Sequence, residues 1–242
     1  MTALLRKLQR ELAKAGDPER AAGMQAYMKS TMPFHGVPSA VMRKICKSVF
    51  AAHPIPDATS WRDDVLGIFR GAKRREEWYA AVELCADKRA RPFQHVDVLP
   101  LYDEIITGAA WWDVVDLVAS HQLGAILRND PAPMKKKMLA WSRDANMWRA
   151  RSAILCQLGF KGDTDVELLY ACIEPSIGSK EFFLRKAIGW ALRQLAWTDP
   201  AEVQRYVAKN RDRLSNLSVR EALKNVSRAT SSPARGARRR SA

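Results

Sequence analysis

A recurring aromatic residue at helix starts constrains the fold of this chain more than any other feature. Four segments resemble one another, each with an aromatic residue followed by small and aliphatic residues: EEWYAAVEL, AWWDVVDLV, NMWRARSAI and EFFLRKAIG. Their aromatic residues Trp78, Trp112, Trp148 and Phe182 are spaced by 34, 36 and 34 positions. A period in the mid-thirties with two helices per unit predicts a helical solenoid of the HEAT or TPR kind, in which stacked helix pairs bury a continuous core.

The rest of the chain also favours an all-α fold. Glycine and proline are sparse, apolar residues recur at helical spacing between them, and no alternating β-branched run indicates a strand. We expect tandem helix pairs forming a curved solenoid with a concave basic face, as one HEAT-like domain over residues 1–227. Short oxygen side chains predict helix starts at Asp17, Ser60, Asp130, Asp163 to Asp165, Asp199 and Ser218.

The chain is strongly basic, with 40 Lys and Arg against 26 Asp and Glu and a formal charge of +14. Such an excess attracts a polyanion, either nucleic acid or an anionic membrane surface, although charge alone only suggests a partner. The last segment has arginines among Ser, Ala, Gly and Pro and no large apolar residue. Residues 228–242 are therefore expected to form a basic, disordered tail that holds nucleic acid without sequence preference.

Several functional classes lack support in the sequence. No stretch is long and apolar enough to cross a membrane, and the first residues predict an amphipathic helix instead of a signal peptide. We therefore expect a cytoplasmic protein. We also expect it to be a monomer. The four cysteines form no CxxC pair and predict buried free thiols, and the scattered histidines show no metal-ligand spacing. Neither a metal nor a cofactor is expected, since phosphate-loop, GxSxG and HExxH motifs are missing too.

Asp116 is the candidate acid on this framework. Alignment of the repeats places it at the position of Ser152 and Lys186, so we expect all three to point the same way from successive repeats. Trp112 lies one helical turn before Asp116, on the same face. Spacing alone does not separate Asp113 from Asp116, and either acid could simply pair with a neighbouring cation. The repeat alignment favours Asp116.

Aromatic and cationic residues accompany this acid, while Trp78 is expected to be structural. Helical spacing puts Arg151 beside Trp148, and it puts Phe182, Lys186, Trp190 and Arg193 on one stripe. Cations bind phosphates and aromatic faces stack on bases or sugars, which suits a nucleotide. A carboxylate there suits cleavage of an N-glycosidic bond, because a fixed anion stabilises the oxocarbenium-like sugar. An alkylated, cationic base would leave as a neutral molecule without a general acid.

Five stretches carry a family resemblance: MQAYMKS (24–30), FHGVPSAVMRKICK (34–47), AAWWDVVDLV (109–118), NMWRARSAILCQL (146–158) and SKEFFLRKAIGWALRQLA (179–196). Through them the chain, from about residue 5 to about residue 227, resembles the bacterial DNA alkylation-repair glycosylases of the HEAT-like repeat type, the AlkD family. It departs from that family at Val37-Pro38-Ser39-Ala40, where other small or polar residues are usual, and in its basic tail.

The resemblance implies a monofunctional glycosylase that releases 3-methyladenine and 7-methylguanine from double-stranded DNA without burying a flipped base in a tight pocket. It assigns catalysis to Asp116, the second acid of the WWDxxD motif, which would stabilise the sugar cation and position water. Trp112 and Trp190 would frame the sugar of the lesion. Contacts with DNA would come from Tyr27, Ser39, Arg43, Lys47, Arg151, Phe182, Phe183, Lys186 and Arg193. Binding to DNA would place the protein on the bacterial nucleoid.

Two other functions stay open on the sequence. A non-catalytic HEAT-like repeat protein that binds damaged or branched DNA would keep the cations and need no carboxylate. A helical scaffold for another protein would bind DNA weakly and with little dependence on salt, because phosphate contacts are what make binding salt-dependent.

Overall fold

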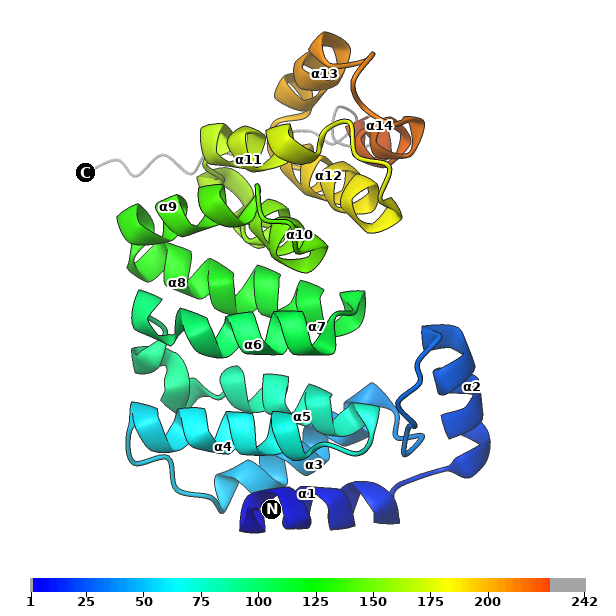
Figure 1. Ribbon diagram of the computed structural model, residues 1–242, viewed down its shortest axis with the longest axis vertical. Helices are drawn as coiled ribbons and strands as arrows, with labels where there is room; N and C mark the ends of the chain where they lie inside the picture. Colours follow the sequence, from blue (N-terminus) through cyan, green and yellow to red (C-terminus); the bar gives the residue numbers. More distant parts are fainter. Residues whose placement is uncertain (1, 227–242) are drawn as a thin grey trace, which may run out of the picture. The chain divides into compact units, whose positions relative to one another are not determined.

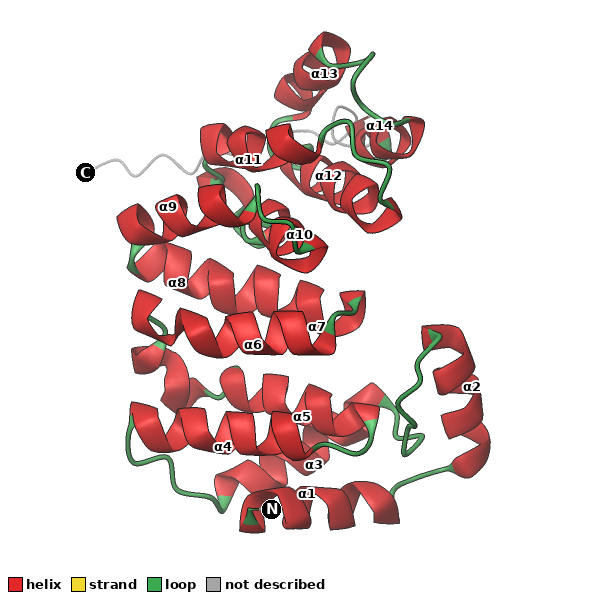
Figure 2. Cartoon of the chain, viewed as in Figure 1, coloured by secondary structure: helices red, strands yellow, loops and turns green. Residues whose placement is uncertain are grey.

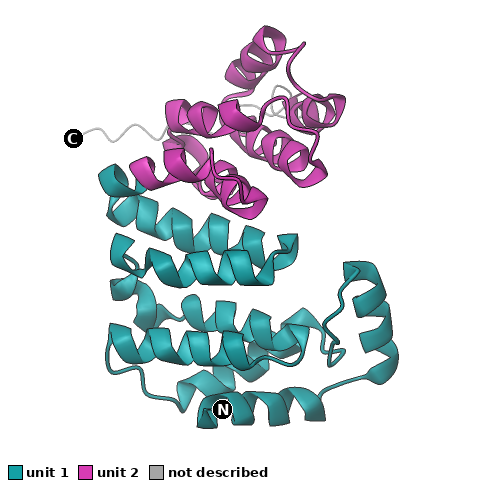
Figure 3. Cartoon of the chain, in the orientation of Figure 1, with its two compact units in different colours: residues 1–134 teal, residues 135–242 magenta. Residues whose placement is uncertain are grey.

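The computed structural model describes residues 2–226, and this part of the chain is helical with no strand (Figures 1 and 2). The predicted all-α class is confirmed. The chain divides into two compact units, Met1–Met134 and Lys135–Ala242, and the division falls inside α9 (Pro131–Trp141) (Figure 3). The predicted tail, residues 228–242, lies outside the described residues, and the single domain over residues 1–227 stays a prediction.

The first unit is a succession of helix pairs. Its helices are α1 (Ala3–Lys14), α2 (Pro18–Met28), α3 (Ser39–Ala51), α4 (Ala58–Gly71), α5 (Arg75–Cys85), α6 (Leu99–Ala109), α7 (Trp112–Leu117) and α8 (Gly124–Asn129), with the 3-10 helices η1 (Lys88–Phe93) and η2 (Val96–Val98) and the π-helical turn η3 (Val118–Leu123). Helix α4 packs against α5 and α6 against α7, and α5 also contacts α3 and α7 (Figure 1). Neighbouring pairs therefore stack through their second helices, and α4 also contacts α1 and α6.

The second unit repeats this arrangement. After α9 it contains α10 (Met147–Leu155), η4 (Lys161–Asp163), α11 (Val166–Ile173), η5 (Glu174–Ser176), α12 (Phe182–Leu195), α13 (Pro200–Lys209) and α14 (Asn216–Leu223). Helix α10 contacts α11, α13 contacts α14, and α12 packs between α10 and α14. The paired helices follow the period of the aromatic residues, which lie on the first turns of α5, α7, α10 and α12.

The first of these aromatic residues is structural, as predicted. The Trp78 indole Nε1 donates to the carbonyl of Phe69 at 3.1 Å, and the two rings stack with centroids 5.4 Å apart. Trp148 is buried, and its ring centroid lies 5.1 Å from that of Phe183. Both tryptophans thus fasten the start of one helix to its neighbour.

Helix starts agree with the sequence where Asp is followed directly by the helix. Asp17, Asp165 and Asp199 cap α2, α11 and α13 by accepting a hydrogen bond from a backbone N–H three residues on. The starts predicted at Ser60 and Ser218 are wrong, because Asp57 and Ser215 lie three residues earlier and cap those helices instead. A second oxygen side chain one turn upstream competes for the same N–H groups.

One buried carboxylate holds the turn before α3. Glu76 accepts backbone N–H hydrogen bonds from His35 (2.8 Å), Gly36 (2.8 Å) and Val37 (3.1 Å). Gly36 has a φ of +82°, and a Cβ there would lie 2.0 Å from the carbonyl oxygen of Asp17. Only glycine fits this left-handed position. The turn therefore fixes how α3 begins.

Two glycine substitutions test this turn. Gly36→Ala should lower the free energy of unfolding by about 1–3 kcal/mol or more, because strain adds to a backbone clash. Gly23→Ala is the matched control, since nothing lies within 4 Å of its Cβ position on α2. It should raise the free energy of unfolding by roughly 0.5–1 kcal/mol through helix propensity. Urea unfolding measures both, and a Gly36→Ala protein as stable as wild type would refute the assignment.

Candidate functional site

Asp113 serves structure in the first unit. Its carboxylate accepts two hydrogen bonds from the Arg75 guanidinium, Nε to Oδ2 at 3.1 Å and Nη2 to Oδ1 at 2.6 Å, and one from the Tyr79 hydroxyl. The Arg75 and Asp113 side chains are only 5% and 10% exposed. Burial opposes the charged form of Arg75, but the bonds and charge of Asp113 outweigh it and raise the pKa of Arg75. This ion pair joins α5 to α7.

Asp116 follows one turn later on α7 and is 9% exposed. Trp112 lies one turn before it and is half-buried. Immediately after Asp116 the helix widens into the π-helical turn η3, and the Asp116 carbonyl accepts the Ser120 hydroxyl at 2.7 Å. Such turns occur frequently at functional sites. Asp113 thus has a structural role, and Asp116, a largely buried carboxylate beside Trp112 and a π-helical turn, remains the candidate acid favoured by the repeat alignment.

The predicted DNA contacts of the first unit lie on its surface. Ser39, Arg43 and Lys47 are all exposed and recur every four residues, so they form one stripe along α3. The opposite side of α3 is buried. Tyr27, on α2, is 77% exposed. An exposed tyrosine and two cations without burial suit contact with another molecule.

Arg151 in the second unit is buried, unlike the surface cations. Its Nη1 donates to the carbonyl of Phe183, and its guanidinium carbon lies 5.8 Å from the centre of the Phe183 ring. The neighbouring Phe182 is 56% exposed and meets Phe183 edge-on, with centroids 5.4 Å apart. Arg151 thus positions the first turn of α12, which presents Phe182 to solvent.

Ser152 and Lys186, which the repeat alignment expects to point the same way, differ in exposure. Ser152 is fully buried, whereas the Lys186 side chain is 40% exposed. Both lie in the second unit, at aligned positions of α10 and α12. The serine side chain is short and ends in the packed interior, whereas the lysine is long enough for its Nζ to reach a carboxylate on α14.

Glu221 is a functional candidate that the sequence reasoning missed. This buried carboxylate on α14 binds Lys186 at 3.2 Å and Arg193 at 2.6 Å, both on α12, and Lys224 at 2.7 Å. The hydrogen bond from Lys224, helped by Lys186, lowers the pKa of Glu221 against the opposing effect of burial. Glu221 lies 35 residues after Lys186, so extending the repeat by one period would have found it.

The approach of α14 to α12 depends on Gly189. A Cβ at Gly189 would lie 2.5 Å from the Cβ of Glu221 and 2.9 Å from the carbonyl oxygen of Ser218. The Ser218 hydroxyl also donates to the carbonyl of Arg185 at 2.9 Å. The close contact holds Glu221 beside the stripe of Lys186, half-buried Trp190 and Arg193.

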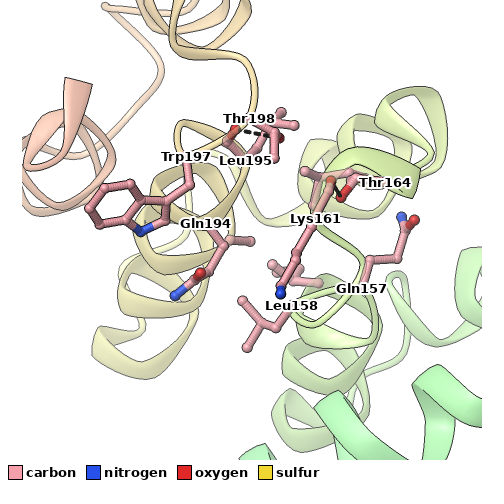
Figure 4. Close-up of a pocket in the computed structure, with 11 residues that line it drawn as sticks. Gln157, Leu158, Lys161, Thr164, Gln194, Leu195, Trp197 and Thr198 are labelled. Carbon is pink, nitrogen blue, oxygen red and sulfur yellow. Dashed lines mark hydrogen bonds between the residues drawn. The ribbon is translucent and has the colours of Figure 1, made fainter. Parts of the chain in front are cut away.

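A separate pocket of about 270 Å³ in the second unit contains none of the predicted site residues. Figure 4 shows Gln194 and Trp197 on one side and Leu158 and Lys161 on the other. The pocket lies where α10 and α12 end. The predicted residues of this unit lie elsewhere, Arg151 on α10 and Phe182, Phe183, Lys186, Trp190 and Arg193 on α12, so the pocket is not part of the candidate site.

All four cysteines are buried and free, as predicted. Burial raises the pKa of Cys46 and of Cys172 to about 12. Burial also raises the pKa of Cys85 and Cys156 well above the usual thiol range. These thiols are therefore protonated and shielded near neutral pH.

Residues 2–226 contain neither a membrane-spanning helix nor a metal-binding cluster. No helix in this range is long and apolar enough to span a bilayer. The same residues hold no group of three or more His, Cys, Asp and Glu side chains suited to a metal ion.

Comparison with known proteins identifies the family. The sequence model of the DNA alkylation repair enzymes matches residues 8–226, so the chain belongs to this family and has a role in DNA repair. A solved structure from Enterococcus faecalis, described as a predicted DNA alkylation repair enzyme, is 28% identical with a TM-score of 0.77. The match covers 86% of this chain and 95% of that one. No curated protein matches the chain. The family resemblance read from the motifs is confirmed.

The buried ion pair gives a prediction about stability. Asp113→Asn leaves the Arg75 charge buried and unpaired and should lower the free energy of unfolding by about 3–5 kcal/mol. Tyr79→Phe keeps the ion pair and removes one hydrogen bond, so it should cost only about 1.5–3 kcal/mol. Urea unfolding of both variants decides the point. An Asp113→Asn protein with wild-type stability would show that Asp113 is not structural.

The Glu221 cluster gives a prediction about pH. Because the folded-state pKa of Glu221 is lowered, its stabilisation is complete above the unfolded-state pKa of about 4.3 and is lost as pH falls through the folded-state pKa. The difference in unfolding free energy between wild type and Glu221→Gln should therefore shrink on acidification below about pH 4.3. Glu174→Gln, at an exposed ion pair with Arg213, is the control and should show little difference. If the difference in unfolding free energy between wild type and Glu221→Gln grew on acidification, the ionised Glu221 carboxylate would not be the stabilising form.

Proposed function

We propose that the protein is a monofunctional DNA glycosylase that hydrolyses the N-glycosidic bond of cationic alkylated purines in duplex DNA. 7-Methylguanine and 3-methyladenine are the expected lesions. The observation that carries this proposal is a largely buried carboxylate, that of Asp116, one turn after Trp112 on α7 and next to a π-helical turn. The other acid of α7, Asp113, has a structural role in its bonds with Arg75 and Tyr79. A carboxylate fixed in a largely buried site can stabilise positive charge that develops on a sugar.

In the proposed reaction the bond between C1′ of the sugar and the base nitrogen breaks, and its electron pair goes to the base. The alkylated purine starts with a positive charge and leaves as a neutral molecule, so no general acid is needed. Asp116 stabilises the cationic sugar and orients a water molecule toward C1′. The water loses a proton as it adds, which leaves an abasic site and a free methylpurine.

The cysteines support hydrolysis over direct transfer of the alkyl group to the protein. Transfer requires a thiolate that is exposed and has a lowered pKa. All four thiols here are buried, and burial raises each thiol pKa. A carboxylate-based route fits these residues better than a thiol-based one.

The contacts with DNA are proposed for each unit separately. In the first unit, exposed Tyr27 and the α3 stripe of Ser39, Arg43 and Lys47 would bind the backbone. In the second unit, Lys186 and Arg193 would bind phosphates and Phe182 and Trp190 would stack on sugar or base, with Arg151 and Phe183 positioning α12. The enzyme would select a lesion by the positive charge of its base and the weakness of its glycosidic bond, and it would not need a tight pocket for a flipped base. HEAT-like repeats, a monomeric state and a nucleoid location belong to the same proposal.

The test is release of free base from methylated duplex DNA. Wild type should release 7-methylguanine, and Asp116→Asn should lower the single-turnover rate by about 10²–10³-fold, as loss of a preorganised electrostatic group does, while binding to DNA survives. Asp63→Asn makes the same change at an exposed position of α4 and should keep wild-type activity.

Two results would contradict the proposal. Full activity of Asp116→Asn would show that another group does the chemistry. Binding of damaged or branched DNA by wild type, with no release of base from any methylated substrate, would replace the glycosylase with the non-catalytic binder.

A further inference from the structure

Two hollows mark the surface of the first unit, beyond the turn that carries Asp116. One, of about 510 Å³, lies between α3 and the region where α5 ends and η1 begins. The other, of about 310 Å³, lies between η1 and the segment formed by η3 and α8. Cationic side chains line both: Arg43, Lys47 and Lys88 the first, and Arg91 and Arg128, with His121, the second.

Four of these cations are exposed and form no close ion pair among the described residues. Arg43, Lys47, Lys88 and Arg91 are exposed, and their side chains make no hydrogen bond or ion pair in residues 2–226. Arg89, between the last two, is the opposite case. Its guanidinium donates to Asp87 and to the carbonyls of Phe50 (2.9 Å) and His53 (2.8 Å) at the end of α3. Arg89 therefore has a structural role, whereas the exposed side chains of Lys88 and Arg91 can contact a ligand.

The two hollows belong to one surface. Lys88 and Arg91 are three residues apart on the 3-10 helix η1, where residues i and i+3 eclipse about 6 Å apart. Glu83 lies near one cation of each hollow, Arg43 on α3 and His121 on η3. Burial raises the pKa of Glu83, and the charges of these two residues partly offset that rise. We call the surface lined by Arg43, Lys47, Lys88, Arg91, His121 and Arg128 the basic groove.

We infer that the basic groove binds the phosphodiester backbone of duplex DNA, and that Lys88 and Arg91 extend the backbone contact of the α3 stripe. Arg43 and Lys47 repeat every four residues, about 6 Å along a helix, and Lys88 and Arg91 have a similar spacing. A row of separated cations suits a polyanion with regularly spaced charges. The inference rests on the proposed binding of DNA.

The composition of the basic groove favours nucleic acid over protein. A protein interface is expected to have an apolar centre with aromatic anchors. The one aromatic ring in the lining, Phe50, is 3% exposed and belongs to the core. Of the acids present, Asp87 is neutralised by Arg89 at 2.7 Å, and Glu83 lies beside Arg43. Net positive charge therefore faces the ligand.

The test compares two double variants of the full chain. Lys88→Gln with Arg91→Gln removes two groove cations, and Lys7→Gln with Arg62→Gln removes two cations that line neither hollow. Binding to an undamaged duplex is measured by fluorescence anisotropy between about 50 and 200 mM KCl. All four side chains are outside the core, and circular dichroism verifies that both variants fold.

The groove variant should bind more weakly at low salt, and the slope of log K against log salt should fall by about 1.8, since each lost phosphate contact removes about 0.9. The control variant should keep the wild-type slope. Equal slopes in the two variants, with wild type still binding DNA, would overturn the inference that the basic groove binds the DNA backbone. Loss of slope only in the groove variant would support it even if wild type released no methylated base, so the two proposals fail separately.

Discussion

The ion pair between Arg75 and Asp113 is the contact on which the first unit depends. A buried guanidinium needs a buried anion, and the two residues lie on successive second helices of the stacked pairs. Tyr79 completes the carboxylate's bonds from α5. The pair fixes the first turn of α7, and with it the places of Trp112 and Asp116.

The second unit also contains a buried charge with partners, but there one carboxylate is paired with several cations. There one buried carboxylate, Glu221, gathers Lys186, Arg193 and Lys224 from two helices. Part of each cation stays exposed, so the cluster retains net positive charge at the surface. Asp113 neutralises a buried cation to hold helices together, while Glu221 orders several surface cations. Both follow from the cost of leaving a buried charge unpaired.

Local patterns in the sequence predicted much of this fold. Features that depend on pairing between residues far apart in the sequence could not be predicted from it. The aromatic period found the helices that begin with Trp112 and Phe182, since those signals act within one turn. Spacing could not separate Asp113 from Asp116, because the deciding partner Arg75 is 38 residues away. The helix start predicted at Ser218 failed because Ser215 caps α14 one turn earlier. The burial of Arg151 depends on the carbonyl of Phe183, 32 residues on, which no local pattern reports.

Analysis of the products formed by wild type from methylated duplex DNA tests the proposed chemistry most directly. Chromatography and mass spectrometry of one single-turnover reaction measure the free base, the DNA strand and the protein together. Hydrolysis assisted by Asp116 predicts free 7-methylguanine, an equal amount of abasic DNA and a protein of unchanged mass. A methyl group found on the protein, with the unmodified base still in the DNA, would contradict hydrolysis and assign repair to a thiol.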